Sequence, residues 1–281
     1  MYNYIIIFIL SILIFIYIAY LFNTNINLDY IKDDIYYLSY KETSNFLLND
    51  SDNYVSNMND ADLYARKVKS KKEYLENISN NTISFNEEEK NKLYKCTKIA
   101  DKFLLNYKKK FDDNIILNGI EIANIKWKLA LVNKPNRTYN IEYEEGMPHT
   151  RNDIIFLSKY VLNNDDDNLI NILIHEKVHI YQRYNYEKIE KIINKMGYVF
   201  SRKTKNIKLL RANPDLNDNI YYDNKNNIEL IGIYKNNTPN GINDIIIKNF
   251  AAEHPYEKMA YDIAEEYTKQ VMNKYKNDNQ L

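Results

Sequence analysis

The chain has 281 residues, 45% of them hydrophobic, and its 38 basic and 38 acidic side chains leave a formal net charge of zero. This balance gives no overall field toward polyanions, which argues against a nucleic-acid partner, and the length suits one catalytic domain with appendages. The single cysteine, Cys96, excludes an intrachain disulfide framework and is expected to be a packed thiol.

The chain begins with an apolar segment. Residues 5–22 carry no charge over about eighteen residues, enough for a helix to cross most of a bilayer's hydrocarbon core. A cleaved signal peptide is the alternative, but the segment lacks a basic start and a small-residue cleavage site. We therefore expect a single-pass membrane anchor at 1–22, followed by a stalk at 23–54. The few flanking charges leave its orientation undetermined.

Helical patterns precede the centre of the chain. One runs from about Asp60 to about Asn77. A second helix is expected to begin at Asn86, because Asn86 with Glu89 three residues later resembles a capping box, and to end near Lys110.

The central part of the chain changes period. Residues 120–132 and 153–158 are rich in β-branched and aromatic side chains and are expected to be strands, and 228–234 is a further candidate. The acidic run that starts at Asp165 then supplies an N-cap and first-turn charges for an apolar helix.

That helix carries the most informative motif of the chain, His175-Glu176 with His179 four residues after the first histidine. Positions i and i+4 share one helix face, so both imidazoles can reach one tetrahedral metal ion with the carboxylate beside its open position. The alternative is two ordinary helix histidines satisfied by hydrogen bonds. Lys177, inside the motif, is expected to point away from the metal to solvent.

A catalytic zinc takes a third protein ligand, which must come from another part of the chain. Glu257 is the favoured candidate, in the first turns of a helix that Pro255 begins and that runs to about Lys274. His254 is the main competitor, and Glu253 and His149 are further ones.

These motifs suggest a family. HExxH at 175–179 with ExxA at 257–260 resembles the gluzincin branch of zinc metallopeptidases, whose metal is held by two histidines and a glutamate from a second helix. Together with residues 148–153, they look similar to uncharacterised zincin-like proteins of large DNA viruses and protists. The resemblance covers roughly residues 55–270. It implies an α+β fold, a zincin-like metalloprotease domain with a small mixed sheet and active-site helices at 55–275, behind the N-terminal transmembrane helix and before a polar tail at 276–281.

The resemblance also implies a function, a membrane-anchored, Zn²⁺-dependent peptide hydrolase acting on peptides or proteins. Glu176 would act as general base toward a zinc-activated water. A further donor would stabilise the oxyanion, and His149, His254, Tyr256 and Arg211 are the candidates. Residues 209–216 could line the cleft, but the substrate is not determined. The alternatives are a catalytically inactive zincin-fold protein acting as a membrane-tethered binding module, and an anchored interaction protein without metal.

Overall fold

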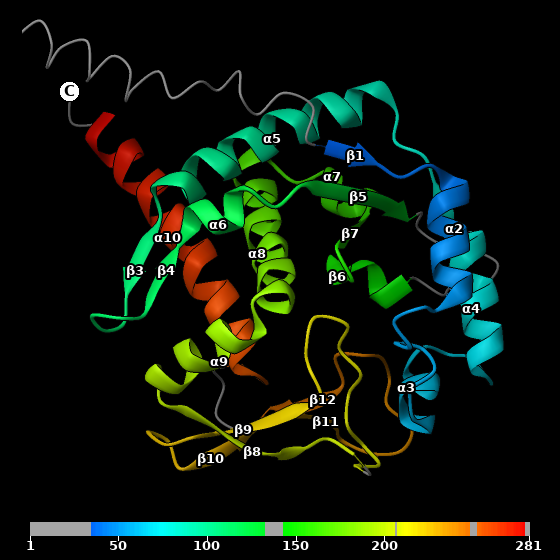
Figure 1. Cartoon of the computed structure of the whole chain (residues 1–281). Helices are drawn as coiled ribbons and strands as arrows, with labels where there is room; N and C mark the ends of the chain where they lie inside the picture. Colours follow the sequence, from blue (N-terminus) through cyan, green and yellow to red (C-terminus); the bar gives the residue numbers. More distant parts are fainter. Residues whose placement is uncertain (1–34, 133–142, 206, 248–251, 279–281) are drawn as a thin grey trace, which may run out of the picture. The chain divides into compact units, whose positions relative to one another are not determined.

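Figure 1 shows the computed structural model, which describes residues 35–132, 143–205, 207–247 and 252–278. Its helices are α2 (Tyr40–Asn49), α3 (Asp60–Ala65), α4 (Lys71–Asn80), α5 (Glu87–Asn106), α6 (Gly119–Ala123), α7 (Lys159–Leu162), α8 (Asp166–Tyr184), α9 (Tyr186–Lys195), α10 (Pro255–Asp278) and the 3₁₀ turn η2 (Tyr143–Gly146). Its strands are β1 (Ile35–Tyr37), β2 (Thr82–Ile83), β3 (Lys108–Lys110), β4 (Ile116–Asn118), β5 (Trp127–Val132), β6 (His149–Arg151), β7 (Ile154–Ser158), β8 (Tyr198–Lys203), β9 (Asn219–Asp223), β10 (Ile228–Leu230), β11 (Gly232–Tyr234) and β12 (Ile245–Ile247).

The largest sheet is mixed and has the strand order β1-β5-β7-β6, with β2 also pairing with β5. The pairs β1 with β5 and β5 with β7 are parallel, whereas β6 runs antiparallel to β7. Strand β6 is therefore the edge strand on the side of α8. An antiparallel edge follows from the short turn at 152–153 that joins β6 to β7, because parallel neighbours need a long crossover.

Strands β5 and β7 are apolar except for Lys128 and Ser158, because both faces of the sheet are covered. On one face, Leu129 and Leu131 pack into a core with α5, α8 and α10. On the other face, Ala130 and Val132 pack into a second core with α2 and α4. Successive side chains of β5 therefore point alternately into two cores. Helix α8 packs against the sheet on the side of the first core.

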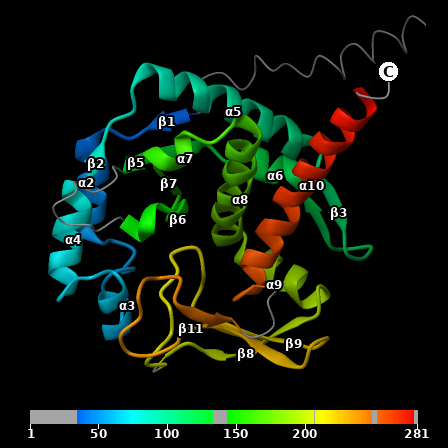
Figure 2. The same ribbon diagram turned by 180° about the vertical axis from the view of Figure 1, so that it is seen from behind.

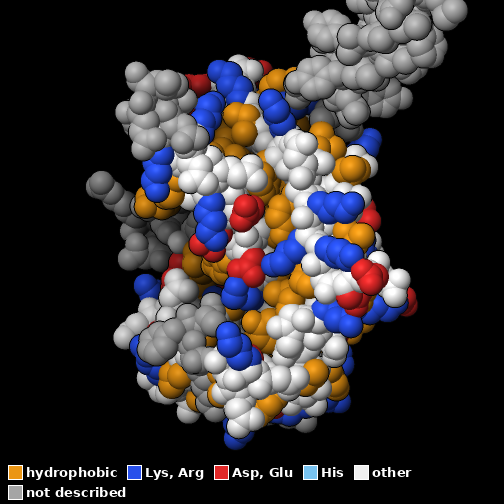
Figure 3. All heavy atoms as spheres, turned by 90° about the vertical axis from the view of Figure 1, so that its left-hand side faces the viewer, with side chains coloured by type: hydrophobic (Ala, Val, Ile, Leu, Met, Phe, Trp, Pro, Cys, Tyr) orange, Lys and Arg blue, Asp and Glu red, His pale blue; other side chains and the backbone are white. Residues whose placement is uncertain are grey.

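The remaining sheets are small. They are the three-stranded β10-β9-β8 and the two-stranded β11-β12 and β3-β4. In Figures 1 and 2, strands β8 to β12 gather beside α9, away from β5 and β7. On the face shown in Figure 3, lysines and arginines are interspersed with acidic and apolar side chains.

The expected architecture requires a correction. The described chain is mixed α/β with several small sheets, not a single small sheet with active-site helices. None of the helices in the described residues is long and apolar enough to span a bilayer, so the transmembrane helix of the expected fold class has no counterpart among them. The expected anchor at 1–22 lies outside the described residues.

Two local expectations are also wrong. The end of the expected stalk folds with the domain, because β1 pairs with β5 and α2 has a capping box of Ser39 and Glu42. The expected strand at 120–132 begins instead as helix α6, where the Asn118 side chain caps the Ile120 amide, and only β5 is extended. A local cap here overrides the β propensity of isoleucine.

Other expectations are confirmed. Helix α5 has Asn86 as N-cap in a capping box with Glu89, although it ends at Asn106, before Lys110. Strand β7 lies within 153–158, and α10 begins at Pro255. The candidate strand at 228–234 is two strands, because β10 pairs with β9 while β11 pairs with β12.

Candidate metal centre

Helix α8 carries the two histidines of the motif. Asp165 is its N-cap and accepts a hydrogen bond from the Asn168 amide, which sets where the helix begins. The spacing of four residues then stacks His175 and His179 on one face, with ring centroids 4.7 Å apart. Their Nε2 atoms face each other at 3.0 Å.

Helix α10 packs against α8 and brings Glu257 to this pair (Figures 1 and 2). Its Oε2 atom lies 3.3 Å from His175 Nε2 and 3.6 Å from His179 Nε2. In a tetrahedral zinc site with bonds of about 2.0–2.1 Å, ligand atoms are about 3.3 Å apart. The three atoms therefore already have nearly the mutual spacing that a shared ion requires.

The hydrogen bonds around His179 set its tautomer. Gln182 Nε2 donates to the Tyr256 carbonyl at 3.0 Å, so Gln182 Oε1 must be the atom 2.9 Å from His179 Nδ1. An amide oxygen only accepts, and Nδ1 therefore carries the hydrogen and leaves a lone pair on Nε2. That is the state in which a histidine binds a metal, and the residues present fit a zinc ion.

The charges of the three candidate ligands influence one another. Burial alone lowers the pKa of His179, but Glu257 and then Asp215 outweigh it, and the pKa is raised overall. Burial alone raises the pKa of Glu257, but His179 and His175 hold it well below its usual range. A negative carboxylate beside two imidazoles favours a cation at this point.

Glu176 lines the same cleft as His175 and Glu257 and is 3% exposed. Its Oε2 atom has no hydrogen-bond partner among the described residues. Burial, then the charges of Asp215 and Glu257, raise its pKa well above the ordinary value, while Arg183 opposes them. A buried carboxylate with a free oxygen and a raised pKa is suited to accepting a proton.

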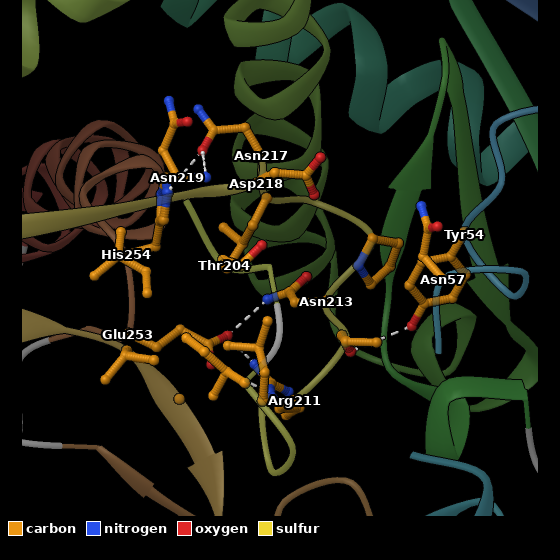
Figure 4. Close-up of a pocket in the computed structure, with 18 of the residues that line it drawn as sticks. Tyr54, Asn57, Thr204, Arg211, Asn213, Asn217, Asp218, Asn219, Glu253 and His254 are labelled. Carbon is orange, nitrogen blue, oxygen red and sulfur yellow. Dashed lines mark hydrogen bonds and ion pairs between the residues drawn. The ribbon is translucent and has the colours of Figure 1, made fainter. Parts of the chain in front are cut away.

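His254 is not part of this cluster. Its Nδ1 accepts the Tyr256 amide at 3.1 Å, and its Nε2 lies 3.2 Å from Asn217 Oδ1. Figure 4 shows His254 beside Asn217, in a second cavity of about 1030 Å³. Both nitrogens are occupied, and burial lowers the pKa of this ring to about 3. His254 therefore caps α10 and holds the turn in which Glu257 lies.

Glu253 is likewise engaged elsewhere. Its carboxylate pairs with Arg211 and accepts a hydrogen bond from Asn213 at 2.7 Å, as Figure 4 shows. Asn213 also donates to Glu257 Oε1 at 3.0 Å, which leaves Oε2 facing the histidines. Asn213 thus orients the carboxylate, a role that no local pattern in the sequence indicates.

His149 lines the cleft without joining the ligand cluster. It is 2% exposed, stacked on Phe156 and edge-on to Tyr143. Its Nδ1 lies 3.0 Å from the Met147 carbonyl and must donate to it, so the neutral ring has a bare Nε2. That Nε2 has no partner among the described residues, and burial lowers the pKa of the ring.

The cleft beside the ligands has a volume of about 960 Å³. Residues 211–215, part of the segment 209–216 that could be either cleft lining or a surface loop from its sequence, form one of its walls, and 211–214 also line the cavity that holds His254. Asp215 accepts the Thr150 amide at 2.7 Å, and Arg183 donates to the Thr150 carbonyl at 3.0 Å. The outer edge of β6 is therefore occupied at Thr150 by Asp215 of this wall and by Arg183 of α8.

Lys177 does not point to solvent, contrary to expectation. It is 1% exposed, bonds Asp101 at 2.6 Å, and lies 4.0 Å above the Trp127 ring. The residue faces away from His175, His179 and Glu257, as expected, but that side of α8 packs against α5. A buried partner carboxylate and an aromatic face compensate for burying the charge.

Tyr261 also lies at this site, although the sequence pattern did not single it out. It follows Glu257 by one turn of α10, and its ring centroid is 4.5 Å from that of His175. Burial, then the charges of Glu257, Glu176 and Glu253, raise its pKa to about 12. The hydroxyl is therefore protonated at neutral pH. Spacing from Glu257 on a helix was the signal that could have found it.

No protein-family model, curated protein or solved structure matches this chain.

Proposed function

We propose that this chain is a zinc-dependent peptide hydrolase, in which His175, His179 and Glu257 hold the ion and Glu176 is the general base. The observation that carries the proposal is the convergence of three ligand atoms, separated by 3.0, 3.3 and 3.6 Å, beside a buried carboxylate with a free oxygen. The tautomer of His179 and the orientation of Glu257 supply two ligand lone pairs without rearrangement.

When bound, zinc supplies Lewis acidity, which acidifies a water and polarises a carbonyl. Glu176 would accept the proton of that water at Oε2 and return it to the leaving amine, so that it ends the cycle as it began. The cleft of about 960 Å³ leaves room for a peptide beside these groups. Its walls include Met147, Ile172 and Ile246, which would exclude water from the reacting groups.

The test has two parts, both on the full chain. Elemental analysis of the purified protein should give about one zinc per chain, and the double variant His175→Ala, His179→Ala should lose it. Peptide-library hydrolysis, followed by mass spectrometry, should fall by at least about 1000-fold in Glu176→Gln while zinc is retained. Glu265→Gln is the matched control, because Glu265 is an exposed carboxylate on the same helix as Glu257, and it should keep both zinc and cleavage.

The results separate three cases. Zinc with cleavage that needs Glu176 supports the hydrolase. If the wild type binds zinc but cleaves no peptide, the chain is a metal-binding protein and Glu176 is not a general base. If the wild type binds no zinc, or the double variant binds as much, the ligand assignment is wrong.

A further inference from the structure

The cleft contains few side-chain donors that are free to bind a substrate. The Asn171 amide donates to the Ala264 carbonyl and to Thr268, and the Asn213 amide donates to Glu253 and Glu257. Arg211 is held by Glu253 through two nitrogens.

The donors proposed from the sequence are also engaged. His149 uses its only hydrogen on Met147, His254 is occupied at both nitrogens, and the Tyr256 hydroxyl bonds Glu190 at 3.1 Å. Two side-chain donors of the cleft remain among the described residues: the Asn243 amide, whose contact is to Met147 Sδ at 3.6 Å, and Tyr261, whose hydroxyl bonds no other described residue. Of these two, Tyr261 is the one in ring contact with His175.

The position of Tyr261 suits a donor to substrate. The side chain is 58% exposed, so its hydroxyl can meet a ligand. Its ring rests on His175, with centroids 4.5 Å apart and planes at 56°, and one turn of helix separates it from Glu257. The ring of Tyr261 is therefore positioned by contact with His175, and its backbone is positioned by the helix that carries Glu257.

We propose that the Tyr261 hydroxyl donates a hydrogen bond to the substrate carbonyl oxygen as that oxygen becomes negatively charged during hydrolysis. This inference rests on the proposed function. The hydroxyl keeps its proton throughout, so no bond to Tyr261 forms or breaks. A donor that meets charge only in the transition state raises kcat and leaves substrate binding nearly unchanged.

Tyr261→Phe tests the proposal, since it removes the hydroxyl and keeps the ring on His175. We expect kcat to fall by about 100-fold with KM changed by less than about threefold, as for loss of one oxyanion donor. Bound zinc and the thermal midpoint should not change. Tyr160→Phe, at an exposed tyrosine on α7, is the matched control and should be silent in every readout.

A binding measurement provides a readout apart from turnover. A phosphinic analogue of the best library peptide carries the charge of the transition state, and by calorimetry Tyr261→Phe should bind it about 100-fold more weakly. The peptide itself, bound to the Glu176→Gln background, should keep its affinity.

If the wild type cleaves peptides and Tyr261→Phe is equally active, this inference is wrong while the proposed function stands. Loss of zinc in Tyr261→Phe would show that the residue supports the ligands instead and also overturns it. A wild type that neither binds zinc nor cleaves peptides overturns the proposed function and this inference together.

Discussion

At the scale of single residues, other side chains fix the orientation of the three proposed metal ligands. Gln182 bonds His179 Nδ1 and the Tyr256 carbonyl, and so ties a ligand of α8 to the first turn of α10. Asn213 donates a hydrogen bond to Glu257 Oε1 and so fixes the orientation of that carboxylate. Such outer partners set which atom faces the metal and how basic it is.

Removing the Gln182 amide is therefore expected to weaken metal binding without removing a ligand. Gln182→Ala should lower zinc affinity by about 10–100-fold, measured by competition with a chromophoric chelator. Gln270→Ala, at an exposed glutamine on α10, should leave the affinity unchanged. Equal affinities for Gln182→Ala and wild type would show that this amide does not orient His179.

The pKa shifts of the ligands predict how stability depends on pH. His179 has a raised pKa in the metal-free fold, so its ion pair with Glu257 stabilises at pH values below about 6.5 and this contribution is lost as pH rises through the folded pKa. Glu257 has a lowered pKa, so its contribution is present above about 4.5 and is lost as pH falls through the folded pKa.

In the proposed site, zinc would compete with a proton on His179, so the stabilisation by zinc should increase with pH while that of the His179–Glu257 ion pair decreases. Urea unfolding between about pH 5 and pH 8 should show the zinc-dependent gain in the free energy of unfolding growing with pH. A gain that is constant over this range would contradict binding at His179. The double variant His175→Ala, His179→Ala should show no gain at any pH.

At the scale of elements, α8 is fixed on both sides. One side meets α10 at the ligands, and the other meets α5 through the Lys177–Asp101 pair over Trp127. Burial raises the pKa of Asp101 although Lys177 and Trp127 oppose the shift, which indicates a costly burial that the pair only offsets in part. The pair lies on the side of α8 that faces α5, opposite the side that carries the histidines.

Breaking this pair on one side should destabilise the fold strongly. Lys177→Met leaves Asp101 buried without its cation and should lower the free energy of unfolding by about 3 kcal/mol in urea. Lys177→Met with Asp101→Leu should cost less, because no charge is left unpaired. If the single and double variants are equally stable, the pair does not act as a unit.

At the scale of the whole molecule, zinc would join two helices that are distant in the chain. The pair α8 and α10 shares a core with β5 and β7, and the wall at 211–215 connects the site to β6. Strand β6 is the edge of the main sheet, so the sheet, both helices and the wall converge on one cleft.

Metal removal should therefore lower global stability. At free zinc about 100 times the dissociation constant, binding adds about 2.7 kcal/mol, which corresponds to roughly 5–10 °C in the thermal midpoint. Calorimetry with zinc and after chelation measures this shift. The double variant His175→Ala, His179→Ala should melt at one temperature under both conditions. An unchanged wild-type midpoint would argue against a metal that links α8 to α10.

The sequence by itself determined the features that depend on local geometry. Asp165 and Asn86 cap helices because their side chains bond amides two or three residues on, and His175 and His179 share a face because a helix has 3.6 residues per turn. Pro255 begins α10 because its fixed φ suits a first turn. The first part of the strand expected at 120–132 is helical, because the Asn118 side chain caps α6 and a local cap is not visible in the β-branched pattern.

Only the tertiary structure decided which distant groups meet. It placed Glu257 at the histidines, turned His254 toward Asn217, buried Lys177 against α5 and left the Tyr261 hydroxyl free in the cleft. Spacing along the chain made Glu257 a candidate and could have indicated Tyr261, but it could not fix any of these contacts, because each depends on how α10, α5 and the wall at 211–215 pack around α8. Packing, which joins segments far apart in sequence, selects one partner from several that local chemistry permits equally.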